Sequence, residues 1–197
     1  MSSYAVVAAV SEALRRILWE EFEKDGVIQP IVGSELAIVF RNPTETARDS
    51  ANRLSLWLHH ITENEFLKNQ PMERGPTYDT LRFPPLALNF SYLVTPFAPS
   101  GEADHLLLGK TMQVLYDNAV ILLRDETSDI GEELRIIFNR LSLEELTRIW
   151  EALREPYRLS LCYQVRVTRI DSQRLTRQAR VIDRLALLRT SLGEEKG

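Results

Sequence analysis

Three segments of the sequence place apolar residues three or four positions apart, as an amphipathic helix does. The predicted helices cover Ser3–Lys24, Ala103–Asn118 and Ser142–Leu153. In the second segment, Leu108, Met112 and Leu115 share one side and are expected to be buried. The third segment opens with Ser142 and Glu145 at the spacing of a capping box, in which each side chain accepts from the other residue's backbone N–H. We therefore predict three helices that each bury one face.

Other segments alternate apolar and polar residues or form short apolar runs, which indicates strands. The predicted strands cover Glu35–Phe40, Arg53–Phe66, Leu86–Thr95, Glu133–Phe138 and Leu159–Ile170. Pro43–Ala51 has room for one helical turn, and Gln70–Pro85, which is rich in proline, glycine and charge, is expected to be an exposed loop. Arg177–Ala186 fits either a strand or a helix.

The longer predicted strands are apolar on one side and polar on the other. A parallel sheet covered by helices on both faces has continuous apolar strands instead. The pattern therefore predicts an α+β fold, with a mainly antiparallel or mixed sheet flanked by helices. No internal repeat is visible, and we expect a single domain over residues 1–197 with an arginine-rich C-terminal segment at 154–190.

The composition is that of a soluble globular protein, with 197 residues, 44% hydrophobic and 26% charged. No window approaches the roughly 18 apolar residues that span a bilayer, and the N-terminus lacks the pattern of a secretory signal. The single cysteine, Cys162, allows no internal disulfide and fits a reducing compartment. These features predict a cytoplasmic protein.

The formal net charge of −4 is unevenly distributed. Residues 154–190 contain nine arginines and three acidic residues, a net charge of +6, so the remainder of the chain carries −10. Arginine pairs well with carboxylates and phosphates through its planar, bidentate group. A protein-contact surface, a nucleic-acid site and a solvated face all remain open at this point. The candidate contact residues are Arg166, Arg169, Arg174, Arg177, Arg180 and Arg184.

Residues that commonly carry catalysis or bind metals give a weak signal. His59 and Glu63 share a face of a regular strand, whereas His60 points to the opposite face, so we expect no metal site there. His105 lies beside Glu102 in a predicted helix start and is expected on the surface. Cys162 has no CxxC partner and is expected to be a buried structural thiol. We find no phosphate-binding loop or nucleophile motif and expect neither an enzyme nor a cofactor.

Two adjacent segments resemble a known family. The strand PPLALNFSYLVTP, residues 84–96, and the helix HLLLGKTMQVLYDN, residues 105–118, resemble the tail-terminator or cap proteins of contractile injection systems of the antifeeding-prophage and virulence-cassette type. The N-terminal helix and the segment YRLSLCYQVRVTRIDS, residues 157–172, add weaker similarity.

The resemblance implies a structural protein of a phage-tail-like particle. It would form a hexameric ring at the end of the inner tube and sheath, stop their polymerisation and anchor the last sheath ring. Its partners would be further copies of itself, the sheath protein and the inner tube protein. The alternative from the arginines alone is a nucleic-acid-binding accessory domain, whose affinity would fall steeply with salt.

Overall fold

The computed structural model describes residues 4–67, 70–74, 80–125, 128–172 and 175–177. Two compact units can be distinguished. The larger contains residues 1–70 and 85–171, and the smaller contains residues 71–84 and 172–197. The prediction of one domain over residues 1–197 is not tested by this division and stays a prediction.

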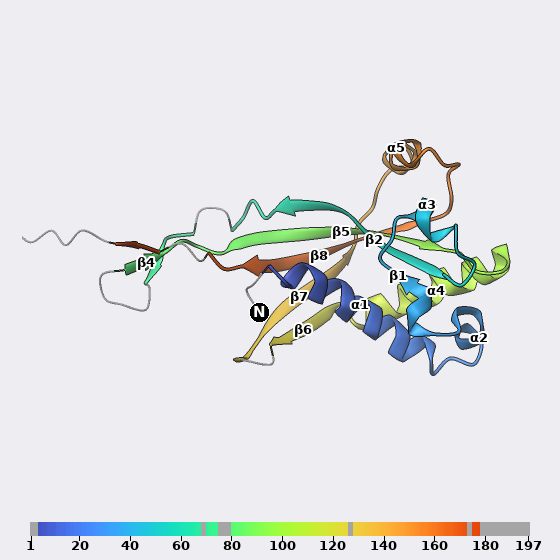
Figure 1. Ribbon diagram of the computed structural model, residues 1–197, viewed down its shortest axis with the longest axis horizontal. Helices are drawn as coiled ribbons and strands as arrows, with labels where there is room; N and C mark the ends of the chain where they lie inside the picture. The colour runs from blue at the N-terminus through green and yellow to red at the C-terminus, as the bar shows by residue number, and fades with distance from the viewer. Residues whose placement is uncertain (1–3, 68–69, 75–79, 126–127, 173–174, 178–197) are drawn as a thin grey trace, which may run out of the picture. The chain divides into compact units, whose positions relative to one another are not determined.

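A mixed sheet of six strands forms the larger unit, in the order β1-β2-β5-β8-β7-β6 (Figure 1). Only the pair β1–β2 is parallel, and the other four pairings are antiparallel. The predicted α+β fold with a mainly antiparallel or mixed sheet is confirmed. The strands are β1 (Ile38–Val39), β2 (Leu54–Glu63), β5 (Leu86–Pro96), β6 (Val120–Asp125), β7 (Ser128–Phe138) and β8 (Leu161–Ile170).

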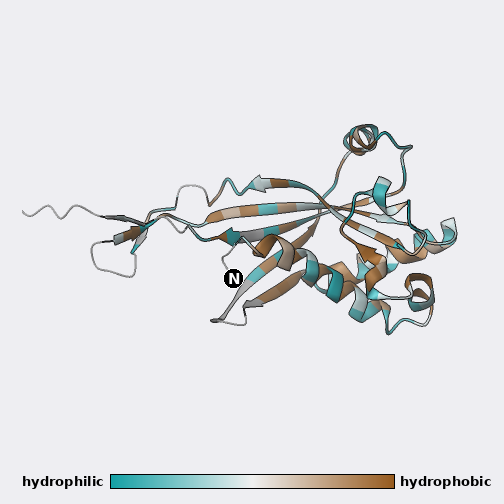
Figure 2. Cartoon of the chain, viewed as in Figure 1, coloured by the Kyte–Doolittle hydropathy of each residue, from teal (hydrophilic) through white to brown (hydrophobic). Residues whose placement is uncertain are grey.

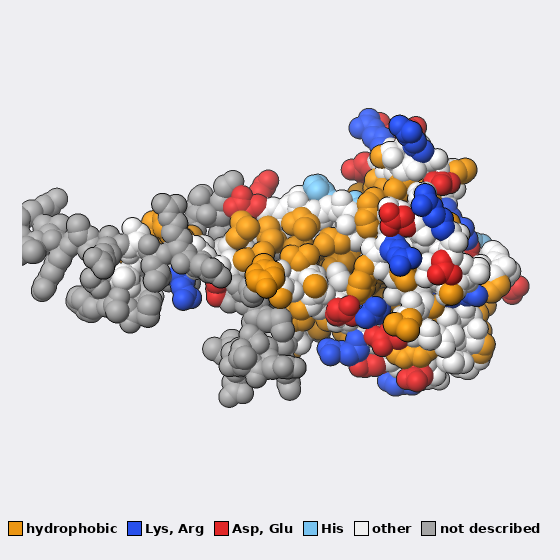
Figure 3. Space-filling model, in the orientation of Figure 1, with side chains coloured by type: hydrophobic (Ala, Val, Ile, Leu, Met, Phe, Trp, Pro, Cys, Tyr) orange, Lys and Arg blue, Asp and Glu red, His pale blue; other side chains and the backbone are white. Residues whose placement is uncertain are grey.

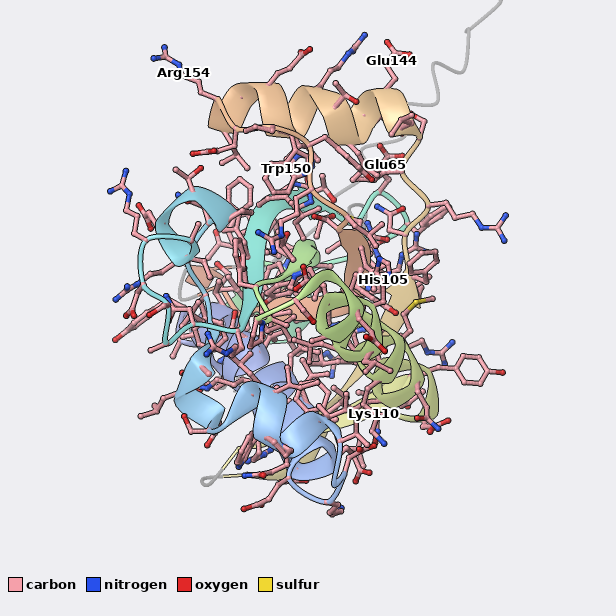
Figure 4. The ribbon with its side chains drawn as sticks, turned by 90° about the vertical axis from the view of Figure 1, so that its right-hand side faces the viewer. Glu65, His105, Lys110, Glu144, Trp150 and Arg154 are labelled. Atoms are coloured by element: carbon pink, nitrogen blue, oxygen red, sulfur yellow. The ribbon has the colours of Figure 1, made fainter. Side chains whose placement is uncertain are left out.

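Helices lie on both sides of this sheet (Figures 1 and 4). Three of them lie on one side, namely α1 (Val6–Phe22), α2 (Ile28–Val32) and α4 (Gly101–Asp117). The helix α5 (Leu143–Leu153) lies on the opposite side, and the single turn α3 (Pro43–Thr46) precedes β2. A short 3-10 helix, Glu35–Ala37, leads into β1, so only the end of the predicted strand at residues 35–40 is extended.

The hydrophobic core lies between the sheet and α1, α2 and α4. Apolar side chains at every second position of the central strands reach it, including Leu54, Leu56 and Phe90, and each is at most 1% exposed. Figure 2 shows hydrophobic residues as brown bands along the strands and on α1. This burial is why the predicted periods of α1, β2 and β5 match the observed elements so closely.

The predicted seam of α4 is partly wrong. Leu108 and Leu115 are buried as expected, but Met112 is 42% exposed. Thr111 is fully buried instead, because its hydroxyl donates to the carbonyl oxygen of Leu107 at 2.8 Å and so needs no solvent. The buried face of α4 is therefore turned slightly from the one that the leucines alone indicate.

The smaller unit contains a three-stranded sheet in the order β3-β4-β9. Its strands are β3 (Glu73–Arg74), β4 (Thr80–Arg82) and β9 (Leu175–Arg177), and both pairings are antiparallel. The segment 70–85 is thus not only the predicted loop, because two short strands in it pair with each other and with a distant segment. Residues 178–186 of the ambiguous segment lie outside the described residues.

Candidate functional site

Two of the six arginines singled out from the sequence lie on one face of β8. Arg166 is paired with Asn89, and Arg169 with Ala87, because the register shifts by one residue between them. This bulge brings both side chains to the face opposite Phe90 and α1, although they are three positions apart. Both are exposed. Arg177 ends β9, and Arg174, Arg180 and Arg184 lie outside the described residues.

Arg135, which the sequence analysis did not select, lies on β7 directly opposite Arg166. Its side chain is 68% exposed, and its Nε lies 3.2 Å from Oε1 of Glu133. Like charges directly opposite on a sheet are destabilising, unless another group compensates them. We call Arg135, Arg166 and Arg169 the arginine face. Its chemistry suits contact with carboxylates or other anions.

Strand β6 forms one edge of the six-stranded sheet, and no described strand pairs with its outer side. It is apolar on both faces. Ile121 and Leu123 point into the core, whereas Val120 and Leu122 are 55% and 57% exposed. An exposed apolar edge strand is a template for pairing with another chain. This edge is therefore a second candidate contact surface.

The side of the sheet that carries α1 continues past this helix as an exposed apolar surface. Ile61 is opposite Phe90, and Leu86 is opposite Ile170, so all four share the α1 side by register. Ile61 is 43% exposed and Leu86 is 45% exposed. Figure 3 shows hydrophobic side chains gathered over the strands of the larger unit, while charged side chains lie over α1, α3 and α5. Such patches commonly mark contact sites.

A further apolar groove of about 410 Å³ lies between the end of α4 and the strands β7 and β8. The exposed Met112 and Tyr116 form one wall, and Phe138 and Tyr163 form the other. The two aromatic rings of the second wall meet edge to face, with centroids 5.3 Å apart. The groove explains the exposure of Met112, since that side chain covers the rim and not the core.

The helix α5 packs on the rest of the unit through one buried side chain and several half-buried apolar ones. Ser142 and Glu145 form the predicted capping box, with Glu145 N donating to Ser142 Oγ at 3.2 Å and Ser142 N donating to Glu145 Oε2 at 2.7 Å. The bonds that the backbone N–H and the hydroxyl of Ser142 donate to its carboxylate hold the pKa of Glu145 below its ordinary value. Trp150 is the one buried residue of α5 and lies beneath the helix, whereas Glu144 and Arg154 point away from the sheet (Figure 4).

Two adjoining hollows lie near α3, and Trp150 lines the first of them. The first, which we call the aromatic cleft, has a volume of about 290 Å³ and is lined by Pro43, Thr44, Ala47, Phe97, Trp150, Glu155, Pro156, Tyr157 and Arg158. The second, which we call the polar hollow, has a volume of about 390 Å³ and is lined by Thr46, Ala47, Asp49, Ser50, Asn52, Arg53, Phe97, Ala98, Pro99 and Arg158. Three residues therefore belong to both hollows.

Cys162 is buried, as predicted, and has two polar neighbours. Its Sγ lies 3.7 Å from Nε2 of His59 and 3.7 Å from Nδ2 of Asn139. A bulge between Leu58 and His60 turns His59 towards this side of the sheet, so the expectation that His59 and Glu63 share a face is wrong. Burial raises the pKa of the Cys162 thiol and lowers that of the His59 imidazole, which favours a neutral pair.

The described residues contain neither a metal cluster nor a membrane-spanning helix. Within the described residues, no group of three or more His, Cys, Asp or Glu side chains is arranged to hold a metal ion. In the same part of the chain, no helix combines the length and apolar character needed to cross a bilayer. His105 is exposed, as expected, and its neighbour Asp104 accepts from Arg158 at 2.9 Å.

Comparison with known proteins gives a family match and structural relatives. The model of the family described as "Pvc16 N-terminal domain" matches residues 9–184. No curated protein matches the sequence. The sheath/tube terminator of PVC, an extracellular contractile injection system, in its extended state is 18% identical, with a TM-score of 0.64 over 100% of this chain and 66% of that one.

The tube-terminating cap of the anti-feeding prophage is also similar. It is 18% identical, with a TM-score of 0.55 over 88% of this chain and 58% of that one. The chain thus spans less than two thirds of either relative's length. At this identity the two structures show a shared fold, which is that of the α+β unit described above.

Proposed function

The chain belongs to the Pvc16 N-terminal domain family, and from this premise we propose that it is a structural tail terminator of a contractile injection system. The family match over residues 9–184 is the observation that carries the proposal. The similar solved structures support it, since one is a sheath/tube terminator and the other a tube-terminating cap. In this role the chain ends the polymerisation of tube and sheath and anchors the terminal sheath ring. It catalyses no reaction.

The proposal includes a homo-oligomeric ring. The resemblance of the sequence to tail-terminator proteins implies that this ring is a hexamer. Two surfaces support self-association, namely the edge of β6 with Val120 and Leu122, and the exposed α1 side of the sheet with Ile61 and Leu86. A closed ring joins unlike surfaces of identical subunits and covers edges that would otherwise template open-ended association. Assembly takes place in the cytoplasm in this proposal, before any release of the particle.

The arginines are proposed to contact the sheath or inner tube protein. The arginine face presents three cations from two neighbouring strands, and the remaining candidates, Arg174, Arg177, Arg180 and Arg184, follow along the chain. Arginine forms bidentate bonds with carboxylates, so acidic surfaces on those proteins are the expected complement. The rest of the chain carries a net charge of −10, which repels a free polyanion that approaches these arginines.

Particle length tests this proposal. We expect reversal of Arg177, Arg180 and Arg184 to glutamate to leave the subunit folded but to give particles of irregular, extended length in electron micrographs. The matched control reverses Arg16, Arg48 and Arg148, which are exposed and lie outside the arginine-rich segment. Normal particle lengths with the first variant would exclude the arginine contacts, and normal lengths without the protein would exclude the terminator role.

A nucleic-acid-binding role is the second candidate, and the opposed pair Arg135 and Arg166 is the observation that favours it. Phosphate contacts release counterions, so such binding weakens steeply with salt. Binding of a DNA or RNA duplex at near-physiological salt, lost on reversal of Arg166 and Arg169, would support it. The net charge of −4 argues against it, because nucleic-acid-binding proteins are usually basic.

A further inference from the structure

Trp150 carries a hydrogen-bond donor that the chain does not use. The side chain is 3% exposed, and its Nε1 has no acceptor within the described part of the chain. Buried indole N–H groups usually donate to a partner, and leaving one unpaired costs about 1–3 kcal/mol. The aromatic cleft is next to this ring. A ligand that brings an acceptor to Nε1 would remove that cost.

The walls of the aromatic cleft select for flat, apolar groups. The rings of Trp150 and Tyr157 meet edge to face, with centroids 6.4 Å apart, and Pro43 and Pro156 add rigid apolar surface. A cation is not the expected ligand. The Arg158 guanidinium already lies 4.5 Å from the centroid of the Phe97 ring, and a cation offers no acceptor to the indole.

The aromatic cleft and the polar hollow together form a site that is longer than one compact ligand. The aromatic cleft and the polar hollow share Ala47, Phe97 and Arg158, so the two adjoin along α3. The aromatic cleft, at about 290 Å³, is close to the lower limit of about 300 Å³ for ligand pockets, so it holds one or two side chains and not a helix. The neighbouring hollow has Asp49, Ser50 and Arg53 in its lining, which can bond the main chain of a ligand. Together they match an extended chain segment.

We propose that the aromatic cleft binds an extended, proline-containing peptide segment of a partner protein, with a main-chain carbonyl oxygen that accepts from Nε1 of Trp150. Proline rings pack flat on aromatic side chains and bring no N–H that would need a partner. A polyproline II segment is also ordered before it binds, which lowers the entropy lost on binding. This binding does not depend on the terminator role, and either can fail alone.

Access to Nε1 requires a small outward movement of α5, because the atom is covered in the free chain. The attachment of α5 permits this movement. Trp150 is its one fully buried side chain, and its other apolar residues are half-buried or exposed. The hydroxyl of Thr44 donates to the Leu153 carbonyl oxygen at a long 3.5 Å. Peptide binding therefore exchanges few contacts of α5 for the new bond.

Magnetic resonance of the indole groups tests the proposal in the full chain. The sequence has three tryptophans, so Trp19 and Trp57 serve as internal controls for Trp150. We expect titration with an acetylated decaproline peptide to shift the Trp150 Nε1–H signal downfield in a saturable way, while the other two signals stay in place. A glycine-serine peptide of equal length should produce no such shift.

Variants separate binding from folding. Tyr157→Ala removes one wall at a residue that is 46% exposed, and we expect about tenfold weaker binding of decaproline. Tyr116→Ala, at an 83% exposed tyrosine on α4, is the matched control and should bind normally. Trp150→Phe keeps an aromatic ring but removes the donor, and should lose binding with the fold intact.

Three results would overturn the proposal. An unmoved Trp150 signal would mean that the peptide does not reach the indole. Equal shifts with the glycine-serine peptide would mean that the cleft does not select proline. Unchanged affinity of Tyr157→Ala would place the peptide elsewhere on the chain, and this outcome can be read even if Trp150→Phe does not fold.

Discussion

The hydroxyl groups of Tyr92 on β5 and Ser11 on α1 lie 2.8 Å apart inside the core. Both residues are buried, so this hydrogen bond joins the helix to the central strand out of contact with solvent. Without Tyr92 the Ser11 hydroxyl keeps only a weak contact with the Val7 carbonyl oxygen at 3.4 Å. The main cost of losing this bond is therefore the buried Ser11 hydroxyl that is left without a good partner, and not the energy of the bond itself.

We expect Tyr92→Phe to lower the free energy of unfolding by about 1–2 kcal/mol, because it leaves a buried hydroxyl without its main partner. Urea denaturation at neutral pH measures the effect. Tyr116→Phe is the control, since that tyrosine is 83% exposed and its hydroxyl meets water in both states. Equal stability of both variants would show that the buried bond contributes nothing.

The same residue predicts an alkaline limit to stability. Burial raises the pKa of Tyr92 to about 12, against the opposing effect of the Ser11 hydrogen bond. In the unfolded chain a tyrosine ionises near pH 10. The stabilising contribution of the neutral phenol is thus complete below about pH 10 and is lost as the pH rises towards about 12.

We expect the urea midpoint of the native protein to fall between about pH 10 and pH 12, and that of Tyr92→Phe to fall less steeply. The slope does not vanish, because burial also raises the pKa of Tyr163 to about 12. Parallel curves for the two proteins would mean that Tyr92 ionises in the folded state as easily as in the unfolded one.

Single residues show where sequence reasoning stops. The buried faces at Leu54, Leu56 and Phe90 could be predicted, because alternation in a strand fixes which residues face the core. The positions of His59 and Arg169 could not, because one extra residue in a strand reverses the face of those beyond it. A bulge depends on the neighbouring strand and leaves no local pattern.

At the scale of elements, α5 depends on its cap as well as on packing. Its first turn, Leu143 to Glu145, is exposed, so the capping box is what holds that end of the helix. We expect Ser142→Ala to speed amide hydrogen exchange throughout α5, because loss of an N-cap typically costs about 1 kcal/mol. Mass spectrometry of the exchanged protein measures this.

The control for that experiment is Thr147→Ala, in the middle of α5. The Thr147 hydroxyl donates to the Leu143 carbonyl oxygen at 2.8 Å, which is a bond within the helix and not a cap. Exchange in α5 should not rise in this variant. Equal acceleration in both variants would indicate that any loss of a side-chain bond opens the helix.

Local patterns predicted the long elements and missed those set by distant partners. The strand β6 was not predicted, because an apolar run as short as Val120–Leu123 fits a buried helix segment as well as a strand. The strands β3 and β4 gave no signal either, since β4 pairs with β9 from the far end of the sequence. Short strands of this kind are stabilised by their partners and not by their own composition.

At the scale of the whole molecule, the unpaired edge of β6 predicts self-association. We expect Leu122→Lys, at a residue that is 57% exposed, to leave the melting temperature unchanged but to reduce the oligomeric mass in light scattering. Leu106→Lys on α4, where the leucine is 45% exposed, is the control. A monomeric native protein would contradict the proposed ring, and an oligomer that Leu122→Lys does not weaken would place its contact elsewhere.

The division of charge along the chain was visible in the sequence, but the arginine face was not. Arg135 stands alone in its segment, and only the pairing of β7 with β8 brings it opposite Arg166. The aromatic cleft was equally hidden, because Phe97, Trp150 and Tyr157 come from two segments about fifty residues apart in the sequence. Contacts between distant segments carry no local signature.

The helix α5 is inserted in the connection between the antiparallel neighbours β7 and β8. Phe138 near the end of β7 is paired with Tyr163 near the start of β8, so residues 139–160 leave and re-enter the sheet about one strand spacing apart, roughly 5 Å. A segment with adjacent ends can be exchanged for another without shifting the register of the strands that hold it. The segment between β7 and β8 can thus be replaced by a different module while the sheet stays unchanged.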